Sequence, residues 1–330
     1  MPVGLFPMSH AIQIQCFGGP EVLKWQSVDV PQPGSGEVRV RNTAVGVNFI
    51  DVYHRTGLYP LELPAIPGRE AAGVIEAVGP QVRHFAEGDR VAYVSSACGT
   101  YTQHCVMPAA RLVRLPDAIA DEQAAAMMLK GLTAQMLLRR IQRVRRSEFI
   151  VIHAAAGGVG LIAVQWAKHL GARVIAIVGS EAKAALVKSH QADHVLQLQD
   201  DWPTQVQNIT RGCGVSVVYD SVGKDTFMRS LDCLQPRGLM VTYGNASGPV
   251  PPIAPLELQK RHSLFLTRPT LFDYIATQAE LRRAATELFD QVLSGAIKIH
   301  LGQKFPLQEA ARAHRALEAR ETVGSTVLIP

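Results

Sequence analysis

The sequence predicts an α/β protein in which a doubly wound parallel sheet is combined with a smaller, β-rich domain. Three observations lead to this prediction. The chain has 330 residues, more than one hydrophobic core usually serves. Its first third contains short strands separated by Gly and Pro, whereas strands and helices alternate from about residue 148 onward. A hydrophobic content of 47% allows a large buried core and excludes a disordered chain.

The β-rich part begins with four short runs of apolar or alternating residues. They are separated by turn residues such as Gly18-Gly19-Pro20 and Gly88-Asp89. This pattern is typical of a small sheet or partial barrel, with strands expected at 11–15, 37–45, 70–78 and 90–94.

The pattern changes near residue 121. We expect a helix over 121–129 with Asp121 as its N-cap, an interruption at Lys130-Gly131, and a second helix over 132–144. The alternating part that follows predicts strands at 148–154, 173–178, 195–198, 215–220, 239–243 and 264–267, and helices at 159–170, 181–189 and 227–234. Alternation of this length indicates a parallel sheet.

The last segment contains two amphipathic helices, 280–293 and 307–317, and then a lone strand at 326–329. A single strand must pair with an existing sheet, and we expect the β-rich part to accept it. The predicted division is therefore 1–128 for the first part of the β-rich domain, 129–270 for the α/β domain, and 271–330 for the return to the β-rich domain.

Composition limits the kinds of binding partner and the cellular compartment that we expect for this protein. The formal net charge of +5 suits small anionic molecules such as phosphates and does not require nucleic acid. Five scattered cysteines without a C-x-x-C pair argue against disulfides and structural zinc, and favour the cytoplasm. The chain contains no apolar run of about 18 residues, so no membrane helix is expected. Residues 1–8 lack the features of a signal peptide; we expect a frayed leader, with Met8 as an alternative start of translation.

The strongest local motif joins the apolar strand at 149–153 to the turn from Ala154 to Gly160. Small residues let a pyrophosphate approach the unpaired N–H groups at the start of the following helix, and Gly160 lets that helix pack close to the strand. Ala154 stands where the first glycine of G-x-G-x-x-G is usual. The alternative is a tight structural turn without a ligand. The cofactor contacts predicted here are Ala156, Gly157, Gly158 and Val159.

The end of the second strand of this unit predicts which dinucleotide binds. NAD-binding units usually carry Asp or Glu there, but this chain has Gly179 and Ser180, with Lys183 shortly after. A hydroxyl and an ammonium suit a 2′-phosphate, so we predict NADPH rather than NADH. Glu181 is expected to point to solvent from the next helix. The alternative for Lys183 is an ordinary solvated helix position.

Several segments together resemble the medium-chain dehydrogenase/reductase superfamily and, within it, the quinone oxidoreductase (zeta-crystallin-like) family, especially the bacterial NADPH:quinone reductases. The likeness covers nearly the whole chain after Met8. The segments that carry it are 18–23, 48–53, 55–60, 68–79, 130–133, 153–168, 219–223 and 267–269.

The resemblance implies a GroES-like catalytic domain, a Rossmann domain and an active site in the cleft between them. It implies that Asn48, Asp51 and Tyr53 line the nicotinamide side, with Lys130 and Thr133 at the floor. It further implies cofactor contacts at Ser221, Tyr243, Gly244, Asn245, Leu266, Thr267, Arg268 and Arg320. Leu198 replaces an aromatic residue of close relatives near the adenosine phosphate, which predicts weaker NADPH binding. A homodimer is implied as well, with the strand at 264–267 as its pairing edge.

The same alignment of motifs argues against catalytic zinc. The Gly-His-Glu turn of zinc alcohol dehydrogenases corresponds to Gly68-Arg69-Glu70, and Asn48 occupies the position of the first Cys ligand. Without a Lewis acid an unactivated alcohol is a poor substrate, whereas a quinone accepts electrons readily. The predicted function is a zinc-independent NADPH:quinone reductase, with Asn48 and Tyr53 as catalytic residues that offer hydrogen bonds to the quinone. Tyr53 is alternatively a packing residue.

Two other functions stay open at this point. One is an NADPH-binding protein with little turnover, with RNA affinity through the arginines at 139–146. We favour a second explanation of these arginines, the dipole at a helix C-terminus, because no aromatic residues are interleaved among them; nucleic acid is therefore not the favoured partner. The other is an enal or enone reductase on the same scaffold.

Overall fold

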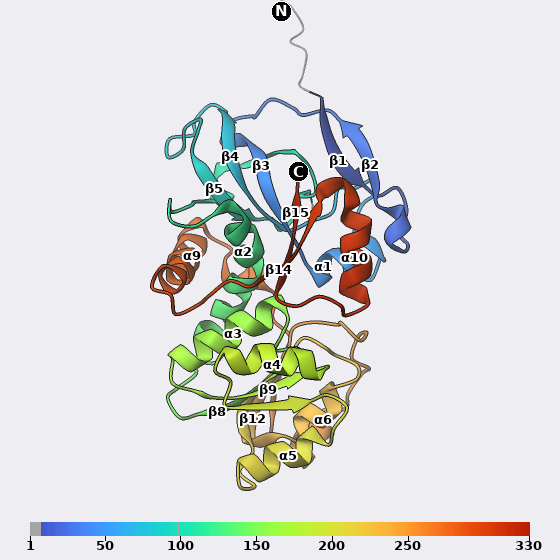
Figure 1. The fold of residues 1–330 in the computed structure, drawn as a ribbon, viewed down its shortest axis with the longest axis vertical. Coiled ribbons are helices and arrows are strands. Elements are labelled where there is room, and N and C mark those ends of the chain that lie inside the picture. Colours follow the sequence, from blue (N-terminus) through green and yellow to red (C-terminus); the bar gives the residue numbers. More distant parts are fainter. Residues whose placement is uncertain (1–7, 98) are drawn as a thin grey trace, which may run out of the picture. The chain divides into compact units, whose positions relative to one another are not determined.

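The computed structural model describes residues 8–97 and 99–330. The predicted leader, residues 1–7, and Cys98 lie outside these ranges. The described chain forms two compact units (Figure 1). The first comprises residues up to Lys130 together with Thr277–Phe289 and Ile299–Pro330, and the second comprises Gly131–Ala276 and Asp290–Lys298.

The first unit is built around a mainly antiparallel sheet. Its strands follow the order β14-β15-β3-β4-β5-β7, with β6 also paired to β3, and β1 and β2 form a separate hairpin-like pair. The strand bounds are β1 (Ser9–Gln13), β2 (Lys24–Val28), β3 (Glu37–Val47), β4 (Glu70–Val78), β5 (Arg90–Val94), β6 (His104–Pro108), β7 (Leu112–Arg114), β14 (Leu301–Pro306) and β15 (Ser325–Ile329).

Strand β3 shows why this sheet forms. Val38 and Val40 are fully buried, whereas Arg41 between the strand's apolar positions is exposed, so the period of two places one face in the core. The helices of this unit are α1 (Phe49–Arg55), the first part of α2 (Asp121–Gln135), α9 (Gln278–Leu293) as far as Phe289, and α10 (Ala310–Glu318).

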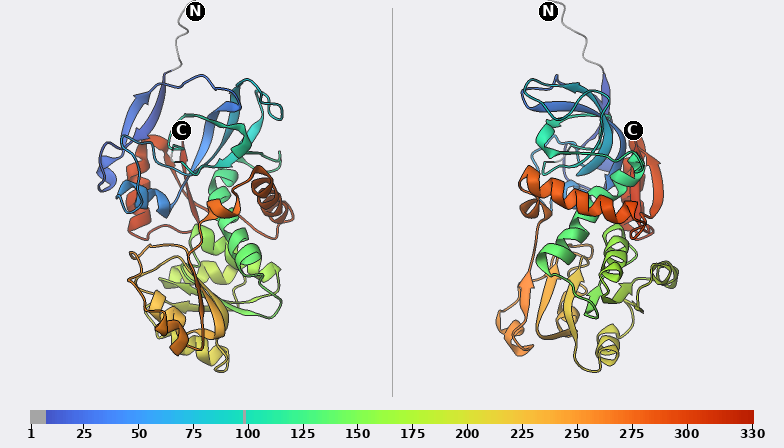
Figure 2. Two further views of the ribbon diagram at one scale, coloured as in Figure 1. Left: turned by 180° about the vertical axis from the view of Figure 1, so that it is seen from behind. Right: turned by 90° about the vertical axis from the view of Figure 1, so that its left-hand side faces the viewer.

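The second unit contains a six-stranded, fully parallel sheet in the order β10-β9-β8-β11-β12-β13. Its centre is buried on both faces, as the apolar run of β11 requires. The bounds are β8 (Phe149–Ile152), β9 (Arg173–Val178), β10 (His194–Gln197), β11 (Val215–Asp220), β12 (Leu234–Thr242) and β13 (Phe265–Thr267). The right-hand view of Figure 2 shows β13, in orange, at the edge of this sheet.

Helices connect the parallel strands, as right-handed crossovers demand. They are α3 (Gly158–His169), α4 (Glu181–Ser189), α5 (Trp202–Ile209), α6 (Phe227–Leu231) and α7 (Leu256–Lys260), and α8 (Leu271–Tyr274) follows the last of these strands. Helix α3 ends as predicted, because Gly171 just beyond it takes a left-handed φ of 83°. The predicted α/β fold with a Rossmann-type sheet is confirmed.

Two predictions about α2 were wrong. The helix is not interrupted at Lys130-Gly131 but continues to Gln135 and then into a π-helical turn, Met136–Ile141. A glycine costs a helix about 1 kcal/mol, and complete burial of neighbours such as Leu132 offsets that cost. Asp121 is the first helical residue rather than a cap, and its carboxylate binds Arg90 and Thr43.

The last strand was predicted correctly. Residues of β15 pair with β14 on one side and with β3 on the other, so the end of the chain completes the sheet of the first unit. In the second unit, β12 begins at Leu234, earlier than predicted, and α6 is correspondingly shorter.

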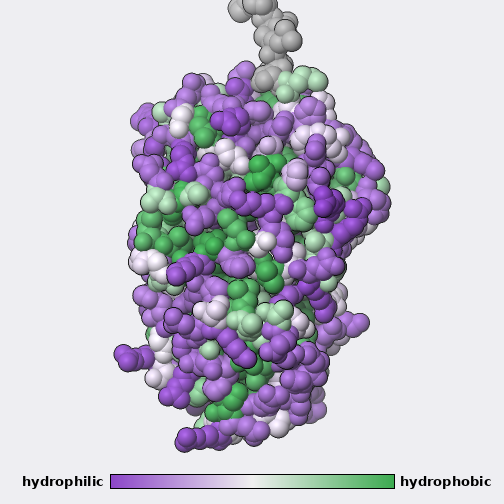
Figure 3. Space-filling view, viewed as in Figure 1, coloured by the Kyte–Doolittle hydropathy of each residue, from purple (hydrophilic) through white to green (hydrophobic). Residues whose placement is uncertain are grey.

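No helix of the described chain has the length and apolar character needed to cross a membrane. Hydrophilic residues predominate on the face drawn in Figure 3, and hydrophobic ones are interspersed among them.

Candidate functional site

The predicted dinucleotide residues of the second unit lie at the carboxyl ends of its parallel strands. The strand order reverses between β8 and β11, because the chain runs outward from β8 to β10 and then returns to β11 on the other side. In open parallel sheets, ligands bind beyond the strand ends at such a reversal. The turns after β8, β9, β11, β12 and β13 carry the predicted contacts.

The turn from β8 to α3 leaves the start of the helix without a side-chain cap. Gly157 precedes α3, no side chain caps this helix, and its first turn carries no acidic residue. A Cβ on Gly160 would lie 2.4 Å from the carbonyl oxygen of Ala154 and 2.6 Å from Cα of Ala155. Helix and turn therefore approach so closely that only glycine fits at this position, in agreement with the sequence argument.

Ala154 takes the left-handed conformation that glycine usually supplies in this motif. Its φ is +47°, and the residue is exposed. An L-residue with a Cβ is disfavoured there by about 1–2 kcal/mol. Ala154 thus adopts a conformation for which glycine, the usual residue at this place of the motif, is better suited.

Ala154→Gly is therefore expected to raise the free energy of unfolding by about 1 kcal/mol, since the relief of the left-handed strain exceeds the entropic cost of glycine. Ala155→Gly is the matched control: Ala155 is buried, has no positive φ, and should lose stability. Chemical denaturation of both variants measures the difference. A loss of stability in Ala154→Gly would contradict the argument.

The end of β9 presents Gly179, Ser180 and Lys183. The Ser180 hydroxyl caps α4 by accepting the backbone N–H of Lys183 at 3.4 Å. A Cβ on Gly179 would have no neighbour within 4 Å, so the space beside this backbone is open. Glu181 is exposed and accepts a hydrogen bond from Gln197, consistent with its predicted outward position. Leu198 packs against the core of the unit beside β9.

The turn after β11 is shaped by Asp220. Its Oδ1 accepts the N–H groups of Val222 and Gly223 at 2.7 and 3.2 Å, and its Oδ2 accepts the Thr226 hydroxyl at 2.8 Å. Asp220 is thus a structural cap, as predicted, and it fixes the loop that carries Ser221.

The turns after β12 and β13 are tied to this loop. A Cβ on Gly244 would lie 2.4 Å from the carbonyl oxygen of Ser221, so the two backbones are in close contact. Arg268 donates from Nη1 to the Gly244 carbonyl at 2.9 Å and to the Thr242 hydroxyl at 3.1 Å. Tyr243 and Asn245 flank Gly244, and Leu266 and Thr267 end β13 beside β12. These predicted residues therefore lie together at the carboxyl ends of neighbouring strands.

In the first unit, the buried carboxylate of Glu70 accepts hydrogen bonds from three groups. Glu70 at the start of β4 is fully buried and accepts the Asn48 amide at 2.8 Å and the Lys130 ammonium at 2.5 Å on Oε1. Its Oε2 accepts the backbone N–H of Leu129 at 2.6 Å. The sequence argument placed Asn48 and Lys130 in the site but missed Glu70. A charged residue opening the apolar run of β4 was the signal that could have revealed it.

Asp51 and Tyr53 both belong to α1. Asp51 is completely buried, and its Oδ2 accepts the backbone N–H of Asn48 at 2.9 Å, which caps the helix. Burial raises the pKa of Asp51 to about 7. The Tyr53 ring packs against Tyr59 at 5.2 Å and Phe49 at 6.2 Å between ring centroids.

Two predicted residues lie elsewhere. Thr133 belongs to the part of α2 that falls in the second unit. Arg320 follows α10 in the first unit and takes a left-handed φ of 59°. The Glu70 cluster therefore contains Asn48 and Lys130 of the predicted set, with Asp51 one hydrogen bond away.

Asn48 and Arg69, which the resemblance aligns with zinc-ligand positions, make other contacts. Arg69 donates to the Ser95 carbonyl at 3.2 Å and contacts His54 Nε2 at 2.5 Å. Burial, and Arg69 next to it, lower the pKa of His54 to about 4, so the imidazole is neutral. Within the described residues, no three His, Cys, Asp or Glu side chains form a group that could hold a metal ion.

Two models of known protein families match parts of this chain. Residues 158–291 match a family model described as a zinc-binding dehydrogenase, and residues 34–117 match one described as an alcohol dehydrogenase GroES-like domain. The GroES-like character predicted for the β-rich part is thereby confirmed.

Comparison with individual proteins extends over nearly the whole chain. It is 50% identical to a quinone oxidoreductase of Pseudomonas aeruginosa over 98% of this chain and 100% of that protein. It is 46% identical to a 2-haloacrylate reductase of a Burkholderia species over 98% and 99% of the two chains. The solved structure of Escherichia coli quinone oxidoreductase complexed with NADPH superposes with a TM-score of 0.96 at 48% identity, covering 97% of this chain and 100% of that one.

Proposed function

Since the chain belongs to the quinone oxidoreductase family of the medium-chain dehydrogenase/reductase superfamily, we propose that it is an NADPH:quinone oxidoreductase that works without zinc. The observation that carries the proposal is the glycine turn before α3, at the strand-order reversal of a parallel sheet, with Ser180 and Lys183 at the end of the next strand. NADPH in a solved relative of 48% identity supports the choice of cofactor.

The residues present fit a phosphorylated dinucleotide. The uncapped start of α3 offers backbone N–H donors to the pyrophosphate, where Ala156, Gly157, Gly158 and Val159 would hold it. Open space beside Gly179, together with Ser180 and Lys183, suits the 2′-phosphate. The turns after β11, β12 and β13 would border the rest of the cofactor through Ser221, Tyr243, Gly244, Asn245, Leu266, Thr267 and Arg268.

NADPH supplies the reducing equivalents when it is bound. In the proposed mechanism, the residues of the first unit orient the reactants. The Asn48 amide gives one N–H to Glu70, so it keeps a second N–H for a quinone oxygen. Tyr53 would offer its hydroxyl to the other oxygen, and unchanged kcat in Tyr53→Phe would leave it a packing residue. Asp51, Lys130, Thr133 and Arg320 complete the proposed cofactor contacts.

Zinc independence is part of the proposal. The positions of two zinc ligands hold Asn48 and Arg69, which are engaged with Glu70 and with His54 and Ser95. A guanidinium is a cation and an amide is a poor ligand for zinc. Metal analysis of the purified protein tests this point, and stoichiometric zinc would refute it.

The test of function is a comparison of electron acceptors. Steady-state oxidation of NADPH is measured with 1,4-benzoquinone, with 2-chloroacrylate, with a simple enone, and with buffer alone. Turnover with benzoquinone well above the other rates supports the proposal. The 2-haloacrylate reductase at 46% identity makes reduction of an activated alkene the second candidate, and dominant turnover of the acrylate or enone would select it. Binding of NADPH without turnover would leave the protein a nucleotide binder.

Lys183→Ala tests the cofactor preference. We expect it to reduce kcat/KM for NADPH by about tenfold, the loss of roughly 1.4 kcal/mol of charge-assisted contact, and to leave kcat/KM for NADH unchanged. Lys188→Ala, at an exposed position later in α4, is the matched control and should change neither value. Equal losses with both cofactors would contradict a 2′-phosphate contact.

We also propose a cytoplasmic homodimer. The described cysteines Cys16, Cys105, Cys213 and Cys233 are free thiols, which suits a reducing compartment. Strand β13 lies at the edge of the parallel sheet, and its Phe265 and Leu266 are 60% and 39% exposed. An apolar edge strand is typical of strand pairing between subunits. Sedimentation of the wild type and of Phe265→Lys would distinguish dimer from monomer.

A further inference from the structure

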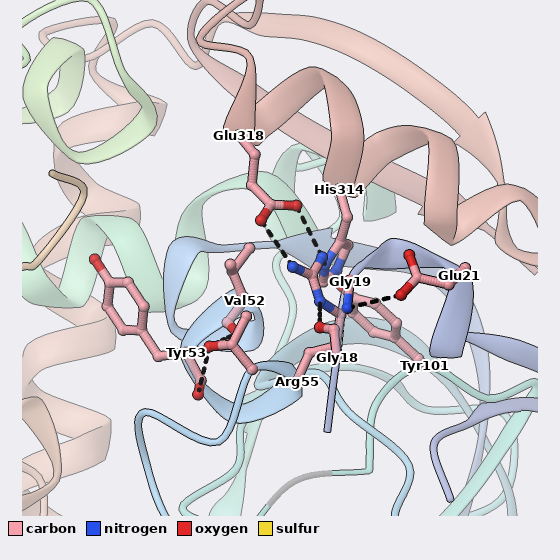
Figure 4. Close-up of polar contacts among 10 residues, drawn as sticks. Gly18, Gly19, Glu21, Val52, Tyr53, Arg55, Tyr101, His314 and Glu318 are labelled. Atoms are coloured by element: carbon pink, nitrogen blue, oxygen red, sulfur yellow. Dashed lines mark hydrogen bonds and ion pairs between the residues drawn. The ribbon is translucent and has the colours of Figure 1, made fainter. Parts of the chain in front are cut away.

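A line of hydrogen bonds between buried side chains joins α10 to α1 within the first unit. Arg55 Nη1 lies 3.1 Å from His314 Nδ1, and His314 Nε2 lies 3.0 Å from the Tyr101 hydroxyl. That hydroxyl lies 3.0 Å from Asp51 Oδ2. Arg55, Tyr101, His314 and Asp51 are each at most 1% exposed. Figure 4 shows Arg55 between Glu318 and His314, with Tyr101 beside them.

Chemistry fixes the direction of every bond in this line. A guanidinium only donates, so His314 Nδ1 accepts. Burial, and Arg55 next to it, lower the pKa of His314 to about 3, so the ring is neutral and carries its one proton on Nε2. Nε2 therefore donates to the Tyr101 oxygen, and the Tyr101 hydroxyl must donate to Asp51. The line ends in a donor aimed at a carboxylate oxygen.

The far end of the line does not carry protons. Arg55 donates to both oxygens of Glu318, at 2.8 and 2.7 Å, and from Nε to the Gly18 carbonyl at 3.0 Å. A guanidinium keeps its protons at any ordinary pH, so it blocks transfer between Glu318 and His314. The line is consequently an orienting device that aims one hydrogen-bond donor, the Tyr101 hydroxyl, at Asp51, rather than a path for protons from solvent.

At the Asp51 end of the line, the two carboxylate oxygens differ in their hydrogen bonds. Oδ2 accepts from Tyr101 and from the backbone N–H of Asn48. Oδ1 is buried without a hydrogen-bond partner among the described residues. The charged and titratable groups facing it are Arg69, Lys130, Tyr101 and, beyond Tyr101, Glu70, His314 and Arg55. The surrounding donors oppose the effect of burial, which keeps the pKa of Asp51 near 7.

We propose that Asp51 is a cofactor-binding residue of the reductase that acts in its ionised form, which holds the start of α1 in the arrangement that binds NADPH, and that Tyr101 positions it. The ionised carboxylate caps Asn48 and presents Oδ1 as an acceptor for an amide N–H, such as that of a carboxamide. In the protonated acid the proton lies on Oδ1, because Oδ2 already accepts two donors. Oδ1 then donates instead of accepting, and the hydrogen bond from Asn48 to Oδ2 loses the assistance of the negative charge. The inference rests on the proposed function, because it concerns how that site binds its cofactor.

Calorimetric titration of NADPH into the full-length protein between pH 6 and 8.5 tests the proposal without any quinone. If the ionised form alone binds, about a tenth of the molecules are competent at pH 6, so affinity should rise about tenfold by pH 8. The 2′-phosphate of NADPH itself titrates near pH 6, so every variant is compared with the wild type at each pH. Asp51→Asn should abolish the tenfold rise in NADPH affinity, so that only the pH dependence caused by the 2′-phosphate remains.

Tyr101→Phe supplies the positioning test. Loss of the donor to Asp51 should raise the midpoint of the affinity curve by about one pH unit, since a hydrogen bond to a charged group has about that effect. Tyr93→Phe is the matched control: Tyr93 is equally buried in the same unit and donates to Asn42 at 2.7 Å. It should cost similar stability and leave the midpoint where it is in the wild type.

Thermal unfolding without cofactor provides an independent readout. The folded carboxyl has a pKa of about 7 against an ordinary value of 3.8, so the folded state holds an extra proton between these values. The free energy of unfolding should therefore fall as pH rises from about 4 to 7, and this fall should be smaller in Asp51→Asn.

The outcomes separate the two proposals. Equal midpoints in the wild type and Tyr101→Phe, or a pH dependence retained in Asp51→Asn, would overturn the role of Asp51. Linked NADPH binding with no turnover of any quinone would support the role of Asp51 and overturn the proposed reaction.

Discussion

Replacing Lys130 by Met is expected to lower the free energy of unfolding by about 3–5 kcal/mol, because it leaves the Glu70 carboxylate buried without its cation. Glu70 is fully buried and Lys130 is 5% exposed. The Asn48 amide and the Leu129 N–H remain as donors, but neither carries a charge. For a unit of this size, the loss corresponds to a fall in Tm of about 10 °C, measured by calorimetry without cofactor.

Lys304→Met is the matched control for this prediction. Lys304 pairs with Glu122 in the same unit, but the two side chains are 51% and 38% exposed. Exposed pairs contribute about 0–1 kcal/mol, so Tm should move by no more than about 3 °C. Similar losses in both variants would mean that the burial of the Glu70–Lys130 pair has no energetic consequence.

Gly160→Ala is expected to cost about 3 kcal/mol, the upper end of the usual range for overpacking. The atoms that its Cβ would meet, at 2.4 and 2.6 Å, belong to the backbone of Ala154 and Ala155, and backbone cannot turn aside as a side chain can. The turn must shift, so we also expect NADPH affinity to fall at least about tenfold, since phosphate binding depends on the position of these N–H groups.

Gly179→Ala separates the steric effect from the loss of a glycine. The added Cβ would have open space around it, and Gly179 has no positive φ. Its free energy of unfolding should stay within about 0.5 kcal/mol of the wild type. Denaturant unfolding of both variants makes the comparison, and a stable Gly160→Ala protein with normal NADPH affinity would refute the close-contact argument.

Local sequence patterns predicted the second unit well, because the residues of its main motif are neighbours in the sequence. The strand, turn and helix around Gly157 are contiguous in sequence, and apolar periodicity marks each element. Helix α5, which begins at Trp202, was not among the predicted helices. Proline in the first turn of a helix is favourable, and the buried Trp202 and Val206 lie four residues apart on one face, so the signal was present.

The buried polar groups of the first unit could not be predicted in the same way. Tyr101 and His314 are separated by 213 residues, and nothing in the local sequence of either residue indicates the other. Their meeting depends on the packing of α10 against the sheet, which periodicity does not specify. Glu70 is marked in the sequence as a charged residue at the start of an apolar run, but its partner Lys130 lies 60 residues later, and no local pattern joins the two.

The position of β15 also sets the order in which the protein can be made. The second unit is formed mainly by the continuous stretch Gly131–Ala276, so it can fold while synthesis continues. The first unit cannot, because Ser325–Ile329 is an interior strand between β14 and β3. Until those residues leave the ribosome, the apolar stretch 45–47 of β3 lacks its partner strand. The nascent polypeptide is then exposed to aggregation at a site that chaperones would have to cover.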